Sequence, residues 1–164
     1  MRCRICQSKN LTKFLNLGFT PPADDFLSPE RLEELEVYYP LEVFICNNCS
    51  LIQLGYVVPP EILYQKDYPY EMSITKTGVK HFHSFAKETF LRFNLSSNDL
   101  VIDIGSNVGV LLQGFKNQGA EVLGIDPAKN ICEIAKSRGI DTINDFFSEN
   151  LARRLLKNIR KRKL

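Results

Sequence analysis

Four of the chain's five cysteines form two pairs with two intervening residues, Cys3 with Cys6 and Cys46 with Cys49. This spacing is that of a tight knuckle, in which backbone amides point at the thiolates. Two knuckles supply four soft ligands for a tetrahedral ion, and zinc is the usual occupant of such a site. Because four thiolates leave no coordination position for water, the pattern predicts a structural zinc site rather than a catalytic one.

The 39 residues between Cys6 and Cys46 exceed the commonest zinc-finger spacing. Residues 41–54, LEVFICNNCSLIQL, nevertheless have the pattern of a strand, a knuckle and a returning strand, the hairpin of a zinc ribbon. Residues 17–27 predict an ordered loop that wraps the zinc site. Disulfide bonds are one alternative, which a cytosolic location disfavours, and a redox CxxC motif is another, which would normally be single. Cys132, alone on a predicted helix, is expected to be a small buried hydrophobe.

Composition narrows the class of protein. The hydrophobic content of 44% suits a packed core, and no uncharged apolar segment approaches the ~20 residues of a membrane-spanning helix. We therefore expect a cytoplasmic protein without a membrane partner. Residues 152–164 carry seven Lys or Arg and no acid, whereas the rest of the chain carries 14 basic and 19 acidic residues. A basic tail on an acidic body does not indicate a nucleic-acid-binding fold, and we interpret it as a solvated helix end.

From residue 100 the sequence has the alternation of an α/β fold. Apolar strands are predicted at 100–105 and 120–127, each followed by a helix, at 108–119 and 128–139, that ends on a glycine. A short third strand is predicted at 140–143. Strand, helix, strand, helix, strand is half of a doubly wound fold.

A helix is also predicted at 77–93, where apolar residues recur near the helical period, and the polar segment 94–99 is a predicted linker. The predicted organisation is an N-terminal zinc-ribbon domain with a connecting helix, residues 1–93, followed by a partial Rossmann-like sheet, residues 94–164.

The loop after the first α/β strand distinguishes between cofactors. The dinucleotide fingerprint is G-x-G-x-x-G, but residues 105–109 here read Gly-Ser-Asn-Val-Gly. Asn107 replaces the second glycine and tolerates a left-handed conformation. Asp103 stands two residues before the first glycine, where a pyrophosphate gives no use for an acid. A carboxylate there suits the cationic methionine end of S-adenosylmethionine (SAM), so the loop predicts SAM, with NAD as the alternative.

Two later acids also point to a nucleotide. Asp126 ends the second strand, 23 residues after Asp103, where its carboxylate can accept both ribose hydroxyls. NAD-binding enzymes also bind the ribose through such an acid, so Asp126 does not distinguish SAM from NAD. Asp145 follows the third strand and can meet the adenine amino group, while Phe146 or Phe147 can pack on the ring. The alternative role of each acid is a helix or turn cap.

These motifs together resemble those of the zinc-containing SAM-dependent C-methyltransferases of nucleotide-activated deoxysugars. The resemblance rests on CRIC, LGFTPPADDF, YPLEVFICNNCSLIQL, DYPYEMS, HF, VIDIGSNVGVLLQGF, LGIDPAKNI and GIDTINDFF, between residues 3 and 147. It implies that the four paired cysteines bind zinc and that Tyr70 and His81 lie near the sugar or the methyl-transfer centre. The predicted cofactor-binding set is Asp103, Gly105, Ser106, Asn107, Gly109, Asp126, Pro127, Asp145 and Phe146.

Two departures from that family bear on function. Val108 stands where the family usually has an acid, and the family continues well past the last resembling motif with further strands, a histidine base and a sugar-covering domain. We therefore expect an N-terminal fragment of a C-methyltransferase acting on a nucleotide-linked keto-deoxysugar, with its first α/β strand an exposed edge. The alternatives are a non-catalytic zinc- and SAM-binding module that assembles with a separately encoded remainder, and an NAD-binding half-domain.

Overall fold

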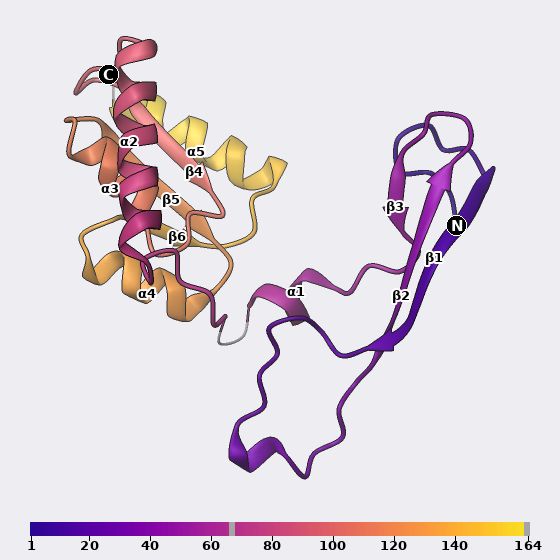
Figure 1. Cartoon of the computed structure of the whole chain (residues 1–164). Helices are drawn as coiled ribbons and strands as arrows, with labels where there is room; N and C mark the ends of the chain where they lie inside the picture. Colours follow the sequence, from indigo (N-terminus) through magenta and orange to yellow (C-terminus); the bar gives the residue numbers. More distant parts are fainter. Residues whose placement is uncertain (66–67, 163–164) are drawn as a thin grey trace. The chain divides into compact units, whose positions relative to one another are not determined.

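The computed structural model describes residues 1–65 and 68–162, with side chains described as far as Lys157. The chain forms two compact units, Met1–Leu63 and Tyr64–Leu164, each described here by itself (Figure 1). Asp67 of the DYPYEMS motif and the outermost basic side chains of the tail lie outside the described residues. The boundary falls after Leu63 and not after residue 93 as predicted, because the helix before residue 93 packs within the second unit.

The first unit contains a three-stranded antiparallel sheet of order β1-β2-β3 (Leu11–Thr20, Tyr39–Cys46 and Ile52–Leu54). The second cysteine knuckle is the turn between β2 and β3, as the pattern of residues 41–54 predicted. Leu11 at the start of β1 pairs with Cys46 at the end of β2. This register brings the first knuckle, which precedes β1, to the same end of the sheet as the second.

The segment between β1 and β2 does not wrap the zinc site, so that prediction is wrong. Thr20 pairs with Tyr39 at the end of the sheet opposite the Leu11–Cys46 pair, and the connection leaves from there (Figure 1). It contains a short 3₁₀ helix, Pro29–Arg31, whose Arg31 guanidinium lies 3.2 Å from the Asp25 carboxylate. The loop's own contacts therefore include this exposed ion pair, and none with the cysteine end of the sheet is needed to place it.

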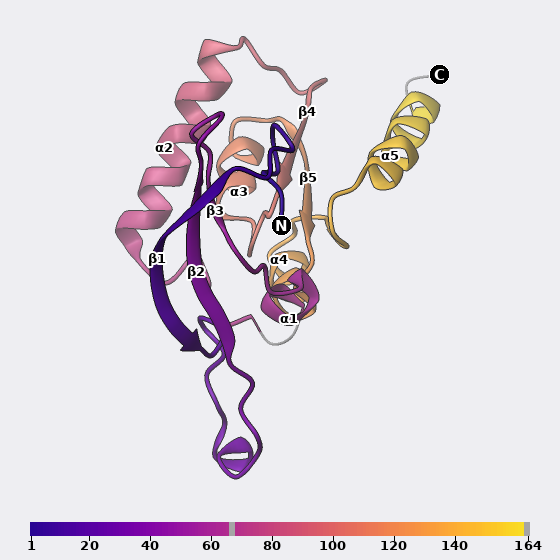
Figure 2. The ribbon, with the colours of Figure 1, turned by 90° about the vertical axis from the view of Figure 1, so that its right-hand side faces the viewer.

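The second unit has the predicted α/β alternation. Parallel strands β4 (Leu100–Ile104), β5 (Glu121–Asp126) and β6 (Thr142–Asn144) lie in the order β4-β5-β6, and α3 (Val110–Lys116) and α4 (Lys129–Ser137) connect them (Figure 2). This is half of a doubly wound, Rossmann-like sheet. Short apolar strands alternate with glycine-terminated helices here, so local sequence was sufficient to predict each element to within a few residues.

Helix α2 (Lys76–Arg92) forms a layer of this unit and is not a free connector. A Cβ atom added to Gly114 of α3 would lie 2.7 Å from the Ala86 Cβ, so the two helices touch where α3 has no side chain. Ala86 is fully buried in a cluster with Phe115 and Ala120. Burial of this face fixes α2 on the second unit.

Strand β4 is the outer strand of the described sheet and pairs there only with β5. Two of its apolar side chains are substantially exposed, Ile102 at 38% and Ile104 at 56%. The expectation that this strand forms an exposed apolar edge is confirmed for the described residues. Helix α5 (Glu149–Arg162) follows β6, with Leu151 buried. Among the described ranges no helix has the length and apolar character needed to cross a bilayer.

Candidate metal centre and cofactor pocket

The four paired cysteines converge on one point at the end of the first unit's sheet. Their ligand atoms all lie within 4.8 Å of one another, and the Cys3–Cys49 and Cys6–Cys46 Sγ distances are both 3.5 Å. All four are free thiols. A tetrahedral ion with metal–sulfur bonds of ~2.3 Å separates its sulfurs by about 3.8 Å. The cluster therefore fits a structural zinc ion with four thiolate ligands.

The two knuckles have the same backbone conformation. In the first, the Gln7 amide donates to the Cys3 carbonyl at 3.1 Å, and in the second the Ser50 amide donates to the Cys46 carbonyl at 2.8 Å. Gln7 and Ser50 each follow the second cysteine of their pair, and both have a φ of 60°. Each turn presents its first cysteine to the interior and its second to the surface, since Cys3 and Cys46 are buried and Cys6 and Cys49 are exposed.

Gln53 of β3 supports the first knuckle, a role that the sequence did not reveal. Its side chain is only 5% exposed. Its Oε1 accepts from the Arg4 amide at 3.0 Å, and its Nε2 donates to the Arg2 carbonyl at 3.2 Å. One buried amide thus fixes the backbone on both sides of Cys3. Groups that orient metal ligands in this way commonly strengthen metal binding.

The thiols differ in acidity before any metal binds. Hydrogen bonding, from the Cys6 backbone first, outweighs burial and lowers the pKa of Cys3 to about 6. For Cys6 the Ser8 backbone acts in the same direction, but burial and the neighbouring thiols raise its pKa to about 12. A metal that takes four thiolates must therefore displace protons from this cluster, which makes its binding pH-dependent.

The second site lies at the carboxyl ends of β4 and β5. The loop after β4 contains three residues with positive φ, Gly105 at 75°, Asn107 at 49° and Gly109 at 78°. A Cβ added to Gly109 would lie 3.0 Å from the Ile140 side chain, so glycine is required there for both conformation and space. The loop's start is tied to the next strand, because the Gly105 amide donates to the Ile125 carbonyl at 2.8 Å.

Asp126 joins this loop to the one that follows β5. Its Oδ2 accepts from the Asn107 amide and its Oδ1 from the Ala128 amide, each at 2.9 Å, and the residue is 7% exposed. A carboxylate has about four acceptor positions, so each oxygen keeps one for a ligand. The ribose-binding role of Asp126 stays a prediction, and the structure adds that its carboxylate holds the two loops together.

Asp103 is partly buried at the end of β4. Burial, first, and the negative charge of Asp126, second, raise the pKa of its carboxyl above the ordinary value. A carboxylate held where its charge is unfavourable gains most from a cationic ligand. This environment suits the ammonium and sulfonium of SAM better than the phosphates of a dinucleotide.

The Asn107 side chain holds an upstream segment against the loop. Its Nδ2 donates to the Tyr70 carbonyl at 2.8 Å, and its Oδ1 accepts from the Met72 amide at 2.9 Å. Asn130, at the start of α4, donates to the Tyr68 carbonyl at 3.0 Å. Residues 68–72, which we call the tyrosine strap, are thereby attached to the 105–109 loop through Asn107 and to the start of α4 through Asn130. Asn107 was predicted to bind the cofactor, and the sequence pattern gave no sign of its hydrogen bonds to Tyr70 and Met72.

The structure does not join Tyr70 and His81 into one catalytic group. The Tyr70 side chain is 55% exposed beside the loop, whereas His81 lies on the surface of α2 with its ring 5.3 Å from that of Phe82. No hydrogen bond links Tyr70 to His81 in the described part of the chain. Their assignment to the substrate side of the site stays a prediction.

The other predicted cofactor residues surround the same strand ends. The Asp145 carboxylate pairs with the Arg154 guanidinium at 3.1 Å, a partner from α5 that the sequence did not indicate. Ser106 is buried, with its hydroxyl against Gly124, while Pro127 and Phe146 are half-buried. Their contacts with a cofactor stay predictions.

Comparison with known proteins bears on both sites. Residues 3–64, which include all four paired cysteines, match the family described as "Putative zinc binding domain". The C-methyltransferase NovU of Streptomyces niveus is 33% identical over 146 residues, which cover 89% of this chain and 34% of NovU. The chain is thus similar to a C-methyltransferase over most of its length, and to a putative zinc-binding domain over residues 3–64. It spans about a third of the length of that curated relative. The zinc-binding prediction is therefore supported both by the relationship and by the cysteine geometry.

Proposed function

We propose that this chain forms the zinc- and SAM-binding part of a C-methyltransferase that acts on a nucleotide-linked keto-deoxysugar. The observation that carries the proposal is the partly buried Asp103 beside the 105–109 loop, in a chain related to NovU. When bound, SAM supplies an electrophilic methyl group. A reducing compartment such as the cytoplasm, in which the cysteines stay free for the metal, fits this function.

In this proposal each group of residues has its own role. The four cysteines hold zinc as a structural ion, because their closed coordination leaves no position for substrate. Asp103 faces the cationic end of the cofactor, Asp126 binds the ribose hydroxyls, and Asp145 with Phe146 contacts the adenine. The Asn107 amide group, through its bonds to Tyr70 and Met72, holds the tyrosine strap at the edge of that pocket.

Methyl transfer to carbon also needs a base that removes a proton next to the sugar carbonyl. Tyr70 and His81 are this chain's candidates on the substrate side. We further propose that a polypeptide segment, in the same or a separate chain, completes the sheet beside β4 and encloses the sugar. The exposed apolar side chains of Ile102 and Ile104 support that part of the proposal.

The second candidate function is a non-catalytic module that binds zinc and SAM for a partner chain. The separation of Tyr70 and His81 favours it. Transfer of labelled methyl from SAM to a 4-keto sugar nucleotide distinguishes the two, measured with this chain plus the C-terminal part of NovU. Labelled sugar whose formation falls on Tyr70→Phe supports a catalytic role for this chain. Labelled sugar formed at a rate that Tyr70→Phe leaves unchanged supports the module, because the added part then supplies the chemistry.

A further inference from the structure

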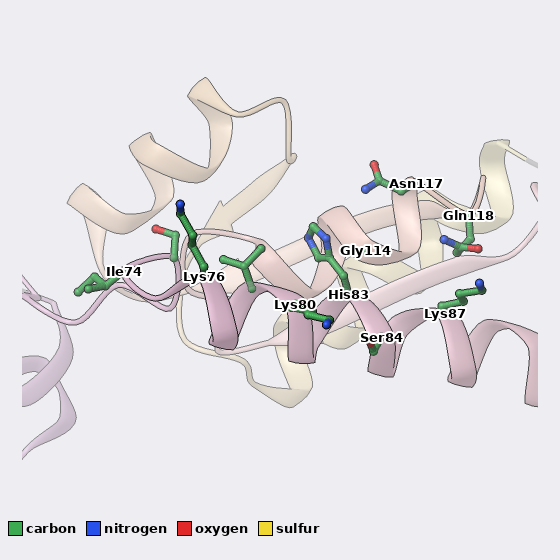
Figure 3. Close-up of a pocket in the computed structure, with 11 residues that line it drawn as sticks. Ile74, Lys76, Lys80, His83, Ser84, Lys87, Gly114, Asn117 and Gln118 are labelled. Atoms are coloured by element: carbon green, nitrogen blue, oxygen red, sulfur yellow. The ribbon is translucent and has the colours of Figure 1, made fainter.

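A groove of about 760 Å³ lies between α2 and the end of α3, entirely within the second unit (Figure 3). Lys76, Lys80 and Lys87 line it from α2, and Asn117 and Gln118 line it from the segment that follows α3. The lysines are four and seven residues apart, a spacing that places them on one face of a helix. None of the groove's lining residues is acidic.

Over the described ranges Lys76, Lys80 and Lys87 take part in no ion pair, as is true of most described lysines; Lys13 and Lys129 are the ones that pair with an acid. The three lysines differ from the other unpaired ones in that they line one groove together, with no acidic side chain beside them in its lining. Like charges four residues apart on a helix repel each other. The lysine row therefore carries an unfavourable interaction that a bound anion would relieve.

Further side-chain donors complete the groove. His83 lies between Lys80 and Lys87 along α2, and Figure 3 shows its ring next to Gly114, with Asn117 and Gln118 on the facing side. A Cβ added to Gly114 would lie 3.2 Å from the His83 Cα, so the absent side chain lets the two walls meet at the floor. Tight packing at this point fixes the spacing between the lysine row and the amide side chains.

We propose that this groove binds a small phosphate-bearing anion through a di- or triphosphate group. Lys76 and Lys80 are one helical turn apart, about 6 Å along the axis, which suits two successive phosphates. The volume lies within the ordinary range of small-molecule pockets. A long polyanion fits poorly, because outside residues 152–164 the chain carries 14 basic and 19 acidic residues. SAM has no phosphate, so this site is distinct from the cofactor pocket and does not depend on the proposed function.

The test is a titration of the zinc-loaded, ¹⁵N-labelled full chain with inorganic pyrophosphate, followed by two-dimensional NMR. Saturable shifts are expected for backbone amides of residues 73–87 and 117–118, with residues 103–109 unaffected. Lys80→Gln should weaken binding about threefold to tenfold, since one charge-assisted contact is lost at an exposed site. Lys80→Arg should largely retain it. Lys129→Gln is the matched control, because Lys129 is an exposed helical lysine outside the groove.

A parallel titration uses a nucleoside diphosphate in place of pyrophosphate. Tighter binding than that of pyrophosphate, with larger shifts at Ile74 and Val79 than pyrophosphate causes, would show that the site also contacts a base. The proposal is overturned if pyrophosphate gives no saturable shifts at millimolar concentration, or if Lys129→Gln weakens binding as much as Lys80→Gln. It is also overturned if a short single-stranded DNA binds these residues more tightly than pyrophosphate. An unchanged ¹⁵N spectrum outside residues 73–87 and 117–118 in each variant verifies that the fold is intact.

Discussion

Asn107 performs two tasks at the residue scale that are usually given to different residues. Its backbone turns the cofactor loop with a φ of 49°, and its side chain bonds to the Tyr70 carbonyl and the Met72 amide. A glycine would satisfy the first task more easily and could not perform the second. The chain therefore keeps asparagine where a dinucleotide-binding loop has its second glycine.

Asn107→Gly separates these tasks and should loosen the tyrosine strap. Two hydrogen bonds are removed, each worth about 0.5–1.5 kcal/mol, so hydrogen exchange at the Met72 amide should accelerate roughly tenfold or more. Asn107→Ala removes the same bonds and adds backbone strain, and should also destabilise the unit. Asn117→Gly, an exposed position after α3, serves as the control. Unchanged protection of Met72 in Asn107→Gly would contradict the strap assignment.

The second prediction concerns how stability and SAM affinity depend on pH through Asp103. Its pKa in the folded chain is raised, by burial first and by Asp126 second. A raised aspartate pKa destabilises the fold where the carboxyl is ionised, so the free energy of unfolding should rise as pH falls from the folded pKa towards the unfolded one. A bound cation favours the ionised form, so SAM affinity should rise with pH through the pKa of Asp103 and then level off.

Calorimetry in buffers of different ionisation enthalpy measures this dependence as proton release on SAM binding. Asp103→Asn should abolish it and weaken binding, whereas Asp141→Asn, an exposed acid outside the loop, should change neither. NAD should bind more weakly than SAM or S-adenosylhomocysteine at every pH. Tighter binding of NAD would reassign the loop to a dinucleotide. Asp126→Ala is a poor substitute for this test, because it also leaves the Asn107 and Ala128 amides unpaired.

At the element scale, zinc should hold the β1–β2–β3 sheet and leave the second unit unaffected. The buried residues of the first unit are Cys3, Cys46 and Gln53, so the metal takes the place of a hydrophobic core, and a structural zinc can contribute on the order of ten kcal/mol. A chelator, or Cys46→Ser, should abolish NMR dispersion of residues 1–63 while residues 68–162 keep theirs. Cys132→Ser is the control, since it alters a buried thiol outside the cluster. About one zinc per chain is expected.

The elements also show what the sequence could and could not predict. Residues 100–144 followed from local pattern, because each strand and helix is short and ends on a glycine or a turn. The position of α2 on the second unit could not be predicted from local pattern. It depends on the contact between Ala86 and Gly114, which are 28 residues apart in sequence and touch because Gly114 has no side chain. The cysteine cluster was predictable from spacing alone. Three polar contacts could not be predicted, because no sequence pattern marks them: those of Gln53, of the Arg154–Asp145 pair and of the tyrosine strap.

At the scale of the whole molecule, the proposed function calls for a further polypeptide segment that pairs with the outer edge of β4. Main-chain groups and the apolar Ile102 and Ile104 side chains lie along that edge, and such edges pair with another strand when one is available. We therefore expect the zinc-loaded chain to self-associate as its concentration rises. Ile102→Lys places a charge on the edge strand and should suppress the association, measured by sedimentation.

Leu91→Lys tests whether that effect belongs to β4, since Leu91 is 62% exposed and lies on helix α2 rather than on a strand. It should leave self-association unchanged. The same pair of variants links the edge to activity. When the C-terminal part of NovU is added, the chain should gain methyl transfer to a keto sugar nucleotide. Ile102→Lys should reduce that gain at least tenfold, with SAM affinity preserved. Equal activity of both variants would place the junction elsewhere, because a strand that does not pair tolerates a lysine.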